Sequence, residues 1–302
     1  MQHKSTRRPL RKEAKETILT VESEDELLKF LLQNLSSKSR NLVKSVLKNK
    51  QISVNGKPTT KFDYALHPGD SVKVNWDIHS VEEPFKGIKI IFEDEYLIVI
   101  QKQAGILSIS TDEEKEETAY SMLWTHVKSE RTSNKIFVVH RLDRDTSGIM
   151  LFAKTFEIKK QLQESWLSTI LERTYIAVVE GHVENEKDTI ISYLKETKSL
   201  IVYSDPKPSF GQKAITHYEV MRHGREYTML KVNLETGRKN QIRVHMKEIG
   251  HSIAGDRKYG AKTNPLKRLG LHAQVLSFTH PVTNEDLSFE TGIPREFKKL
   301  FF

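Results

Sequence analysis

The residues best suited to chemistry lie in one stretch, His140 to Lys154, which reads HRLDRDTSGIMLFAK. Its first half holds two carboxylates, Asp143 and Asp145, beside two arginines. An apolar run with strand composition precedes this polar segment, and a continuous apolar run follows it after Gly148. A polar loop between two buried strands is a typical way to present reactive groups. The candidate reactive group is therefore the carboxylate of Asp143 or Asp145.

Two other interpretations of this stretch remain open. Acids beside arginines commonly form only a solvated surface cluster. The stretch also resembles the phosphatase pattern, in which D-x-D-x-T follows an apolar strand, because Asp143, Asp145 and Ser147 nearly fit it. However, residues 140–142 separate the strand from the first aspartate, and Thr146 stands one place too early. The phosphatase pattern is therefore a poor match.

The segment HRLDRDTSG, residues 140–148, resembles the signature of the RluA-type pseudouridine synthases. The resemblance covers roughly residues 88–302. It extends to several further motifs in the same order, which together identify a family far more specifically than one motif does. It implies an enzyme that breaks the bond from ribose to a ring nitrogen of uracil and rejoins the ribose to a ring carbon. Later segments match the family in the same order: RTYIAVVEG (173–181), TGRKNQIRVH (236–245), GDRKYG (255–260) and LHA (271–273).

The resemblance also implies the roles of individual residues. Asp143 would be the catalytic carboxylate, which either attacks the anomeric carbon or removes a neighbouring ribose proton. Arg243, in the Q-I-R motif, would be the fixed cation that keeps this carboxylate ionised in a partly desolvated cleft. Tyr175 would stack on the uracil and assist proton loss from the ring carbon. Arg141 would enter the space that a flipped-out uridine leaves.

Without the resemblance, Arg243 would be interpreted as a surface residue and Tyr175 as a core tyrosine. The chain departs from the family at Lys239-Asn240, where Thr-His is more common, and at Arg173, where lysine is common. The implied reaction oxidises nothing and adds nothing, so we expect neither a metal nor an organic cofactor. The sequence agrees, because it has no G-x-G-x-x-G motif or P-loop and its histidines lack ligand spacing.

Composition limits the class of protein. The chain has 302 residues, of which 37% are hydrophobic, enough for one large domain or a large and a small one. It has no cysteine, no apolar run of membrane-spanning length and no secretory signal, so a cytoplasmic location is the simplest expectation. The net charge of +8 favours a polyanionic partner.

The N-terminal part predicts a separate module. Residues 1–17 form a basic tail, residues 18–77 a compact unit, and residues 78–87 a linker to a catalytic domain at 88–302. Ser23 and the acids after it predict the start of a first helix. A second helix after Ser39 would carry a basic face, and a small sheet would follow. This pattern resembles the S4 RNA-binding domain, although a solvated lysine face is the commoner case. The residues expected on the basic face are Arg40, Lys44 and Lys48.

The remaining elements must position the catalytic stretch. Strands at 88–91 and 97–100 and a helix at 118–128 precede it. After it, Thr155 should cap a helix that buries Ile158, Leu162 and Trp166. Further strands are expected at 175–179 and 227–234, and a helix that ends at Gly250. Strands dominate without regular strand–helix alternation, which predicts an α+β fold. Its central mixed, largely antiparallel sheet would follow a small S4-type α/β module.

The predicted function is an RNA pseudouridine synthase that acts as a monomer. The N-terminal module favours large-subunit (23S) ribosomal RNA, or the pre-ribosomal large subunit, as the partner. Two alternatives remain: a synthase that acts on transfer RNA, and a non-catalytic RNA-binding or ribosome-assembly factor on the same scaffold.

Overall fold

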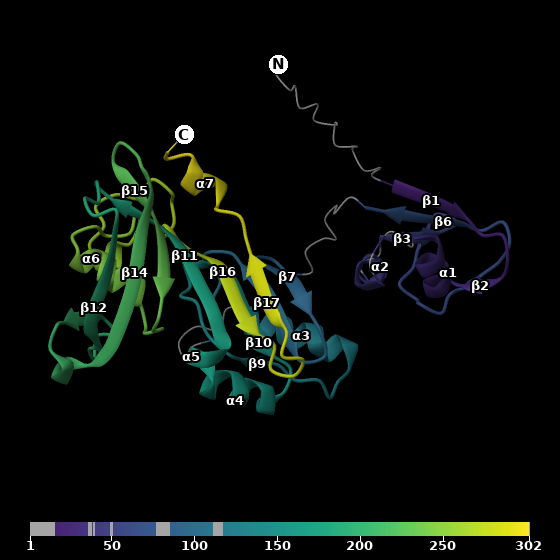
Figure 1. Ribbon diagram of the computed structural model, residues 1–302, viewed down its shortest axis with the longest axis horizontal. Helices are drawn as coiled ribbons and strands as arrows, with labels where there is room; N and C mark the ends of the chain where they lie inside the picture. Colours follow the sequence, from purple (N-terminus) through teal and green to yellow (C-terminus); the bar gives the residue numbers. More distant parts are fainter. Residues whose placement is uncertain are drawn as a thin grey trace, which may run out of the picture. The chain divides into compact units, whose positions relative to one another are not determined.

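The computed structural model describes residues 16–35, 38, 40–48, 51–76, 85–110 and 117–301. The chain divides into two compact units, Met1–Pro84 and Phe85–Phe302, which are described separately (Figure 1). Most of the expected basic tail and linker lies outside the described residues. Within the described residues, no helix is long and apolar enough to cross a membrane.

The first unit packs two helices against a small antiparallel sheet. Its strands lie in the order β1-β6-β3-β4, and β2 pairs separately with β5. Leucines and valines from both helices and the sheet form one core. Arg40 and Lys44 are exposed, and nothing is described of the Lys48 side chain. The elements are β1 (Glu16–Thr20), β2 (Asp25–Glu26), α1 (Leu27–Asn34), α2 (Arg40–Lys48), β3 (Ile52–Val54), β4 (Lys57–Pro58), β5 (Ala65–Leu66) and β6 (Ser71–Asn75).

The first helix begins later than the sequence predicts. Ser23 is not its cap: α1 starts at Leu27, and Glu26 in the cap position makes no side-chain bond to the helix. Instead, the Leu27 N–H donates to the carbonyl of Tyr64 at 2.9 Å. A tertiary contact therefore satisfies a helix-start donor that a local cap would otherwise satisfy.

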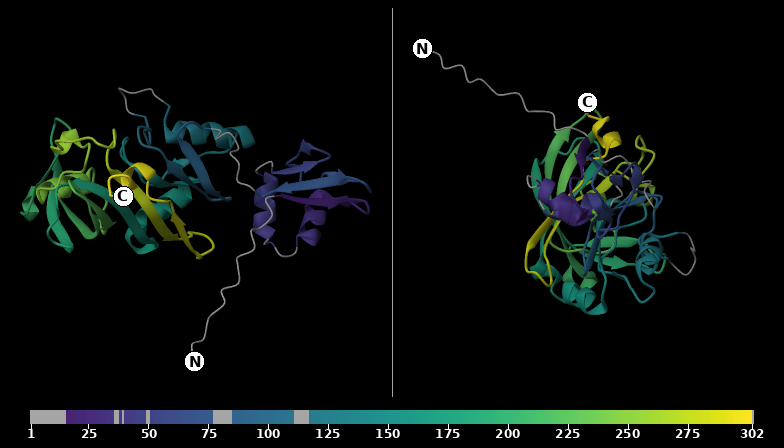
Figure 2. Two further views of the ribbon diagram at one scale, coloured as in Figure 1. Left: turned by 90° about the horizontal axis from the view of Figure 1, so that it is seen from above. Right: turned by 90° about the vertical axis from the view of Figure 1, so that its right-hand side faces the viewer.

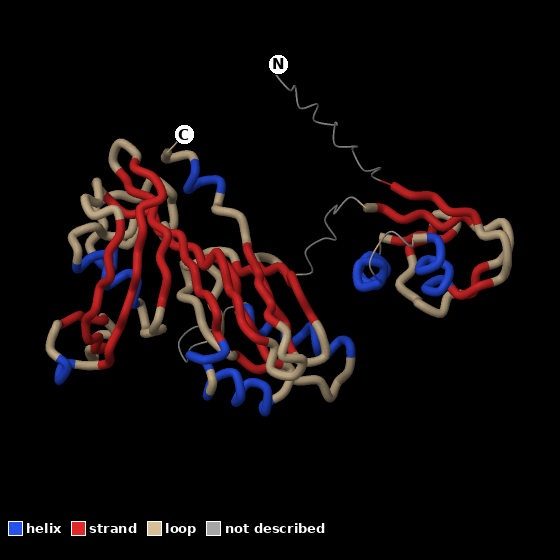
Figure 3. Tube along the Cα trace, viewed as in Figure 1, coloured by secondary structure: helices blue, strands red, loops and turns tan. Residues whose placement is uncertain are grey.

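The second unit is built on one large twisted sheet with few helices (Figures 2 and 3). Its order is β13-β12-β14-β15-β11-β16-β10-β8-β7, with β17 on β16 and β9 on β10. The strands are β7 (Ile88–Glu93), β8 (Leu97–Lys102), β9 (Phe137–Val138), β10 (Ser147–Ala153), β11 (Ile170–Glu180), β12 (Lys187–Glu196), β13 (Val202–Asp205), β14 (Gln212–His223), β15 (Tyr227–Leu234), β16 (Leu271–Thr279) and β17 (Asp286–Glu290).

Among these strands only β10 and β16 pair in parallel, so the predicted α+β fold with a mixed, largely antiparallel sheet is confirmed. The S4-type identity of the first unit stays a prediction. The helical segments of the second unit are α3 (Ala119–Glu130), α4 (Phe156–Glu164), α5 (Trp166–Thr169), η1 (Pro208–Phe210), α6 (Gln241–Glu248), η2 (Arg257–Tyr259) and α7 (Arg295–Lys298).

Side-chain alternation assigns the helices to the two faces of this sheet. On one face, α3 packs on Ile100 and Met150, and α6 packs on Ala177 and Val232. On the opposite face, α4 packs on neighbouring residues such as Leu151. Thr155 caps α4 as predicted, but the helix stops at Glu164, so Trp166 starts α5 instead of extending the buried face of α4.

Gly148 allows the central strands β10 and β16 to meet. Its φ is +124°, and a Cβ there would lie 2.1 Å from the carbonyl oxygen of Ala273. The same Ala273 is the register partner of both Gly148 and Tyr175. Therefore this close approach places the loop before β10 near Tyr175.

We predict that Gly148→Ala lowers the thermal unfolding temperature by several degrees. The added methyl group must displace backbone, and such overpacking costs about 1–3 kcal/mol. Gly250→Ala is the matched control, because Gly250 also has a positive φ, of +86°, but nothing lies within 4 Å of the added carbon. Melting followed by circular dichroism should show the larger loss for Gly148→Ala. Equal losses would mean that backbone strain alone, not the close approach, makes this glycine necessary.

Candidate active site

The loop between β9 and β10 turns at Asp143. The N–H of Thr146 donates to the Asp143 carbonyl at 3.2 Å, which closes a turn over residues 143–146. The side chain of Asp143 is 34% exposed. Asp145 is exposed at the outer end of the turn, and Arg141 is also exposed. The two candidate carboxylates therefore differ in their surroundings, because Asp143 is partly shielded from solvent and Asp145 is exposed.

Buried hydrogen bonds from Lys102 connect this loop to the end of β8. Lys102 is fully buried at the end of β8. Its ammonium donates to the carbonyls of Gln103 at 3.1 Å, Ile106 at 2.7 Å and Arg144 at 2.9 Å. Burial lowers the pKa of Lys102 to about 7, although the nearby Asp145 carboxylate opposes this. Because one amine ties β8 and its connecting segment to the turn, the loop that carries Asp143 is fixed in position.

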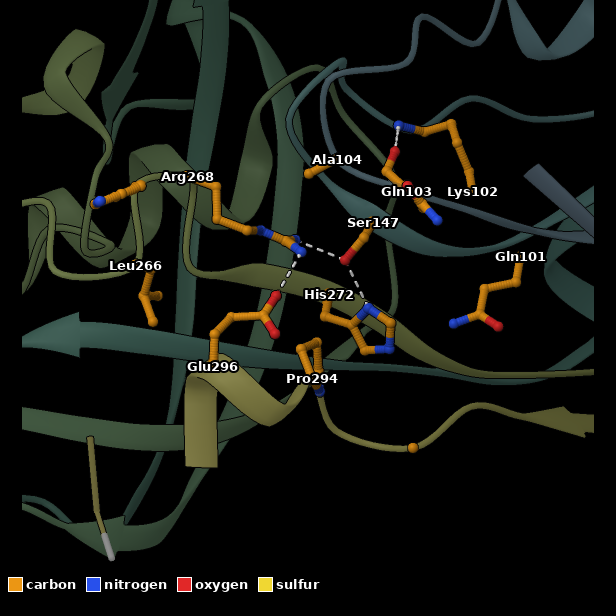
Figure 4. Close-up of a pocket in the computed structure, with 12 residues that line it drawn as sticks. Gln101, Lys102, Gln103, Ala104, Ser147, Leu266, Arg268, His272, Pro294 and Glu296 are labelled. Atoms are coloured by element: carbon orange, nitrogen blue, oxygen red, sulfur yellow. Dashed lines mark hydrogen bonds and ion pairs between the residues drawn. The ribbon is translucent and has the colours of Figure 1, made fainter. Parts of the chain in front are cut away.

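A second network anchors the end of the loop at Ser147, the first residue of β10 (Figure 4). The Ser147 hydroxyl lies 2.7 Å from Nδ1 of His272 and accepts a hydrogen bond of 2.6 Å from Arg268. Arg268 also pairs with Glu296 at 3.2 Å. Burial lowers the pKa of His272 to about 4, so its ring is neutral. These side chains border a cavity of about 420 Å³.

The key cation of the site is Arg243 on α6. Its Nη1 donates to the Asp143 carboxylate at 3.1 Å. Its Nε and Nη2 donate to both oxygens of Asp256, at 2.7 and 2.8 Å. Burial opposes the positive charge, but the Asp256 hydrogen bonds and charge, with a smaller contribution from Asp143, raise the pKa of Arg243. The guanidinium therefore stays charged and fixed against Asp143.

Asn240 and Tyr259 complete the support of Arg243. Asn240 precedes α6 in a left-handed conformation, with φ of 54°, and its Oδ1 accepts a hydrogen bond of 3.1 Å from Nη1 of Arg243. Its Nδ2 donates to the Tyr259 hydroxyl at 2.8 Å. The Tyr259 ring lies 4.9 Å from the guanidinium. Asparagine tolerates the left-handed region well, so this departure from the family pattern has a defined structural use.

Tyr175 lies on β11, on the sheet face that α3 and α6 cover, between the cores that these two helices form. Its ring is half-buried and packs against both the α3 cluster and the α6 cluster. Burial raises the pKa of Tyr175; the charge of Arg173 opposes this rise and that of Asp143 adds to it. The phenol is therefore protonated at neutral pH. A flat ring at this junction can support a planar ligand beside Asp143.

The structure thus brings together Asp143, Arg243 and Tyr175 and places Arg141 on the surface of the same loop. Arg40 and Lys44 belong to the other unit. Sequence reasoning assigned no role to Lys102, Asn240 or Asp256. Asp256 could have been noticed because it lies in the GDRKYG motif. However, nothing in that motif shows that Asp256 pairs with Arg243. Within the described residues, no cluster of three or more His, Cys, Asp or Glu side chains could hold a metal ion.

Comparisons with known proteins identify the family of this chain. The family model described as RNA pseudouridylate synthase matches residues 96–248. An uncharacterized RNA pseudouridine synthase of Bacillus subtilis, YlyB, is 34% identical over 284 residues, which cover 90% of this chain and 91% of the relative. Ribosomal large subunit pseudouridine synthase D of Escherichia coli K12 is 30% identical over 280 residues, covering 87% and 85%.

Solved structures show the same fold. Human RNA pseudouridylate synthase domain containing 4 aligns with a TM-score of 0.57 at 22% identity, covering 69% of this chain and 90% of the human chain. The human domain containing 1 protein aligns with a TM-score of 0.55 at 21% identity, covering 72% and 86%. With the family match and the full-length relatives, the predicted family is confirmed: the chain belongs to the RluA-type RNA pseudouridine synthases.

Proposed function

We propose that this RNA pseudouridine synthase modifies uridines of large-subunit ribosomal RNA and that Asp143 is its catalytic carboxylate. The observation that carries the catalytic assignment is the ion pair of Asp143 with an arginine that Asp256 holds by two hydrogen bonds. The ribosomal substrate is supported by the name of the Escherichia coli relative. We also propose that the enzyme acts in the cytoplasm, as a monomer, because a ribosomal RNA substrate would be found there.

The reaction exchanges one bond of the ribose for another. The bond from the anomeric carbon to the ring nitrogen breaks, and the same carbon then bonds to a ring carbon, which loses its proton. Asp143 either forms a transient bond to the anomeric carbon or removes a neighbouring ribose proton. In both routes the carboxylate must be ionised, and Arg243 stabilises its charge in a site that is partly closed to water. The atoms of substrate and product are the same.

Tyr175 and Arg141 have supporting roles in this proposal. The Tyr175 ring stacks on the uracil and so holds it while the ribose is transferred. Its raised pKa means that the phenol begins the reaction protonated. A uridine in structured RNA must leave its stack, at a cost of about a few kcal/mol. Arg141 is exposed two positions before Asp143, where its side chain can fill the vacated space.

The first unit is proposed to be an S4-type RNA-binding module. Arg40 and Lys44 are exposed four residues apart on α2, so they share one helix face, to which Lys48 adds a third cation by spacing. Such a face attracts phosphates without reading base sequence. It would raise the affinity for a large RNA substrate.

We predict that Asp143→Asn abolishes pseudouridine formation. The amide cannot attack the anomeric carbon or accept a ribose proton, so the rate should fall by at least about a thousandfold. Ribosomal and transfer RNA from cells that lack the gene would be mapped for pseudouridine after re-supply of each variant. Asp145→Asn is the matched control, because it removes an exposed carboxylate from the same turn.

Wild type and Asp145→Asn should restore the lost sites, and Asp143→Asn should not. Restoration by Asp143→Asn would refute the catalytic assignment. Lost sites in transfer RNA alone would favour the alternative substrate. If deletion of the gene altered no site, the non-catalytic assembly factor would become the better account.

A separate prediction concerns the module. The double variant Arg40→Gln/Lys44→Gln should weaken binding to a 23S ribosomal RNA transcript. It should also reduce the slope of log affinity against log salt concentration by about 1.5, because two phosphate contacts are lost. The matched control is Lys57→Gln/Lys61→Gln, which removes two exposed charges elsewhere in the same unit. An equal slope for both double variants would rule out a specific basic face on α2.

A further inference from the structure

Arg173 is a second arginine on the strand that carries Tyr175. The two residues are separated by one position on β11, where the pairing with β16 shifts register between Thr174 and Tyr175. The guanidinium of Arg173 lies close enough to the Tyr175 phenol for its charge to oppose the rise in the pKa of Tyr175. The Cα atoms of the two residues are about 6.6 Å apart along an extended strand. One step of an RNA chain can cover this distance. A nucleotide that stacks on Tyr175 therefore brings its backbone close to Arg173.

The Arg173 guanidinium is held in one place by uncharged groups. Its Nη2 donates to the carbonyls of Leu234 at 3.0 Å and Glu235 at 2.9 Å. The Trp166 ring lies 5.8 Å from its central carbon. On another side, Nη1 lies 2.8 Å from the point where a Cβ would sit on Gly237. The glycine therefore provides the space that this guanidinium occupies.

This charge lacks the carboxylate that the other buried arginines of the site have. Arg243 pairs with Asp143 and Asp256, and Arg268 pairs with Glu296. Throughout the described residues, Arg173 makes no such ion pair. The acids nearest in sequence are bound elsewhere: Glu172 accepts a hydrogen bond from Thr174 and Glu235 pairs with His217. A largely buried cation without a counter-charge is costly unless an anion arrives.

Two donors of Arg173 remain open toward solvent. Its Nε and Nη1 reach no acceptor in the described part of the chain, and neither is among the buried polar atoms that lack a partner. Burial lowers the pKa of Arg173, but an arginine stays charged at neutral pH. The result is a fixed, charged guanidinium whose free Nε–H and Nη1–H groups point in different directions, and either group can donate a hydrogen bond to an oxyanion.

We propose that Arg173 binds a phosphate group of the substrate RNA, adjacent to the uridine that stacks on Tyr175. The role rests on the proposed function, since an RNA substrate supplies phosphates beside this strand. The phosphate supplies the missing counter-charge, and one of its oxygens can accept a hydrogen bond from an open N–H group of Arg173. The contact fixes the register of the RNA relative to Asp143 without reading a base.

The test measures RNA affinity against salt concentration. The probe is an unmodified 23S ribosomal RNA transcript, bound across about 50 to 300 mM KCl. Arg173→Gln removes the charge but keeps an amide donor for the carbonyls of Leu234 and Glu235. Its slope of log affinity against log salt should be smaller than that of the wild type by about 0.7–0.9, the loss of one phosphate contact. Arg173→Lys should keep the wild-type slope.

Arg225→Met is the matched control. Arg225 is exposed in the turn before β15, whereas Leu234 ends that strand, so the same charge is removed far from the site. It should leave the slope unchanged. A wild-type slope for Arg173→Gln would overturn the proposal, even with weaker binding, because a purely structural role would not alter counterion release. An equal slope change for Arg225→Met would overturn it as well.

A second variant keeps the test decisive if Arg173→Gln fails to fold. Gly237→Ala would displace the flexible end of Arg173 without removing any charge. It should weaken binding to the same transcript, and wild-type affinity would contradict the proposal. Pseudouridine formation by the wild type on this transcript is scored separately. If none forms, the ribosomal substrate is wrong. The salt dependence of binding by the wild type and the Arg173 variants still shows whether Arg173 contacts a phosphate.

Discussion

The guanidinium of Arg243, shared between Asp143 and Asp256, is the interaction on which the site depends. The Asp256 side chain is 1% exposed and Arg243 is 15% exposed, so both charges have lost most of their hydration. Such a pair is stable only with good geometry, and removal of one partner commonly costs about 3–5 kcal/mol. Because Asp256 holds the Nε and Nη2 edge of the guanidinium, Nη1 is directed toward Asp143. The cation is therefore oriented before any substrate arrives.

The sheet supplies the rigidity that this arrangement requires. Close pairing of β10 with β16 at Gly148 sets the distance between the catalytic turn and Tyr175. Lys102 holds the turn through backbone carbonyls, and His272 and Arg268 hold Ser147. On α6, His245 is fully buried and bridges Ser192 and Thr216, so the helix of Arg243 is bound to the same sheet. The loop that carries Asp143 and the helix that carries Arg243 are therefore both anchored to the sheet.

Local patterns predicted the elements better than the contacts between them. The strand at Tyr227–Leu234 and the helix after Thr155 follow from alternation and capping, which are encoded within a few residues. The cap at Ser23 was wrong because the Tyr64 carbonyl, distant in sequence, receives the Leu27 N–H. Asp143 and Arg243 were paired in advance only through the family resemblance. The parts played by Lys102, Asn240 and Asp256 depend on folding and have no local signature.

The central claim is that Arg243, positioned by Asp256, orients the Asp143 carboxylate for the reaction. The most direct measurement is the single-turnover rate of pseudouridine formation on a 23S ribosomal RNA transcript. The double variant Arg243→Met/Asp256→Asn removes the cation without leaving a buried unpaired carboxylate, and Asp256→Asn alone is its control. In the double variant, the account predicts a rate about a hundredfold below that of the wild type and below that of the control, because the carboxylate is no longer held in place. A wild-type rate in the double variant would contradict the account.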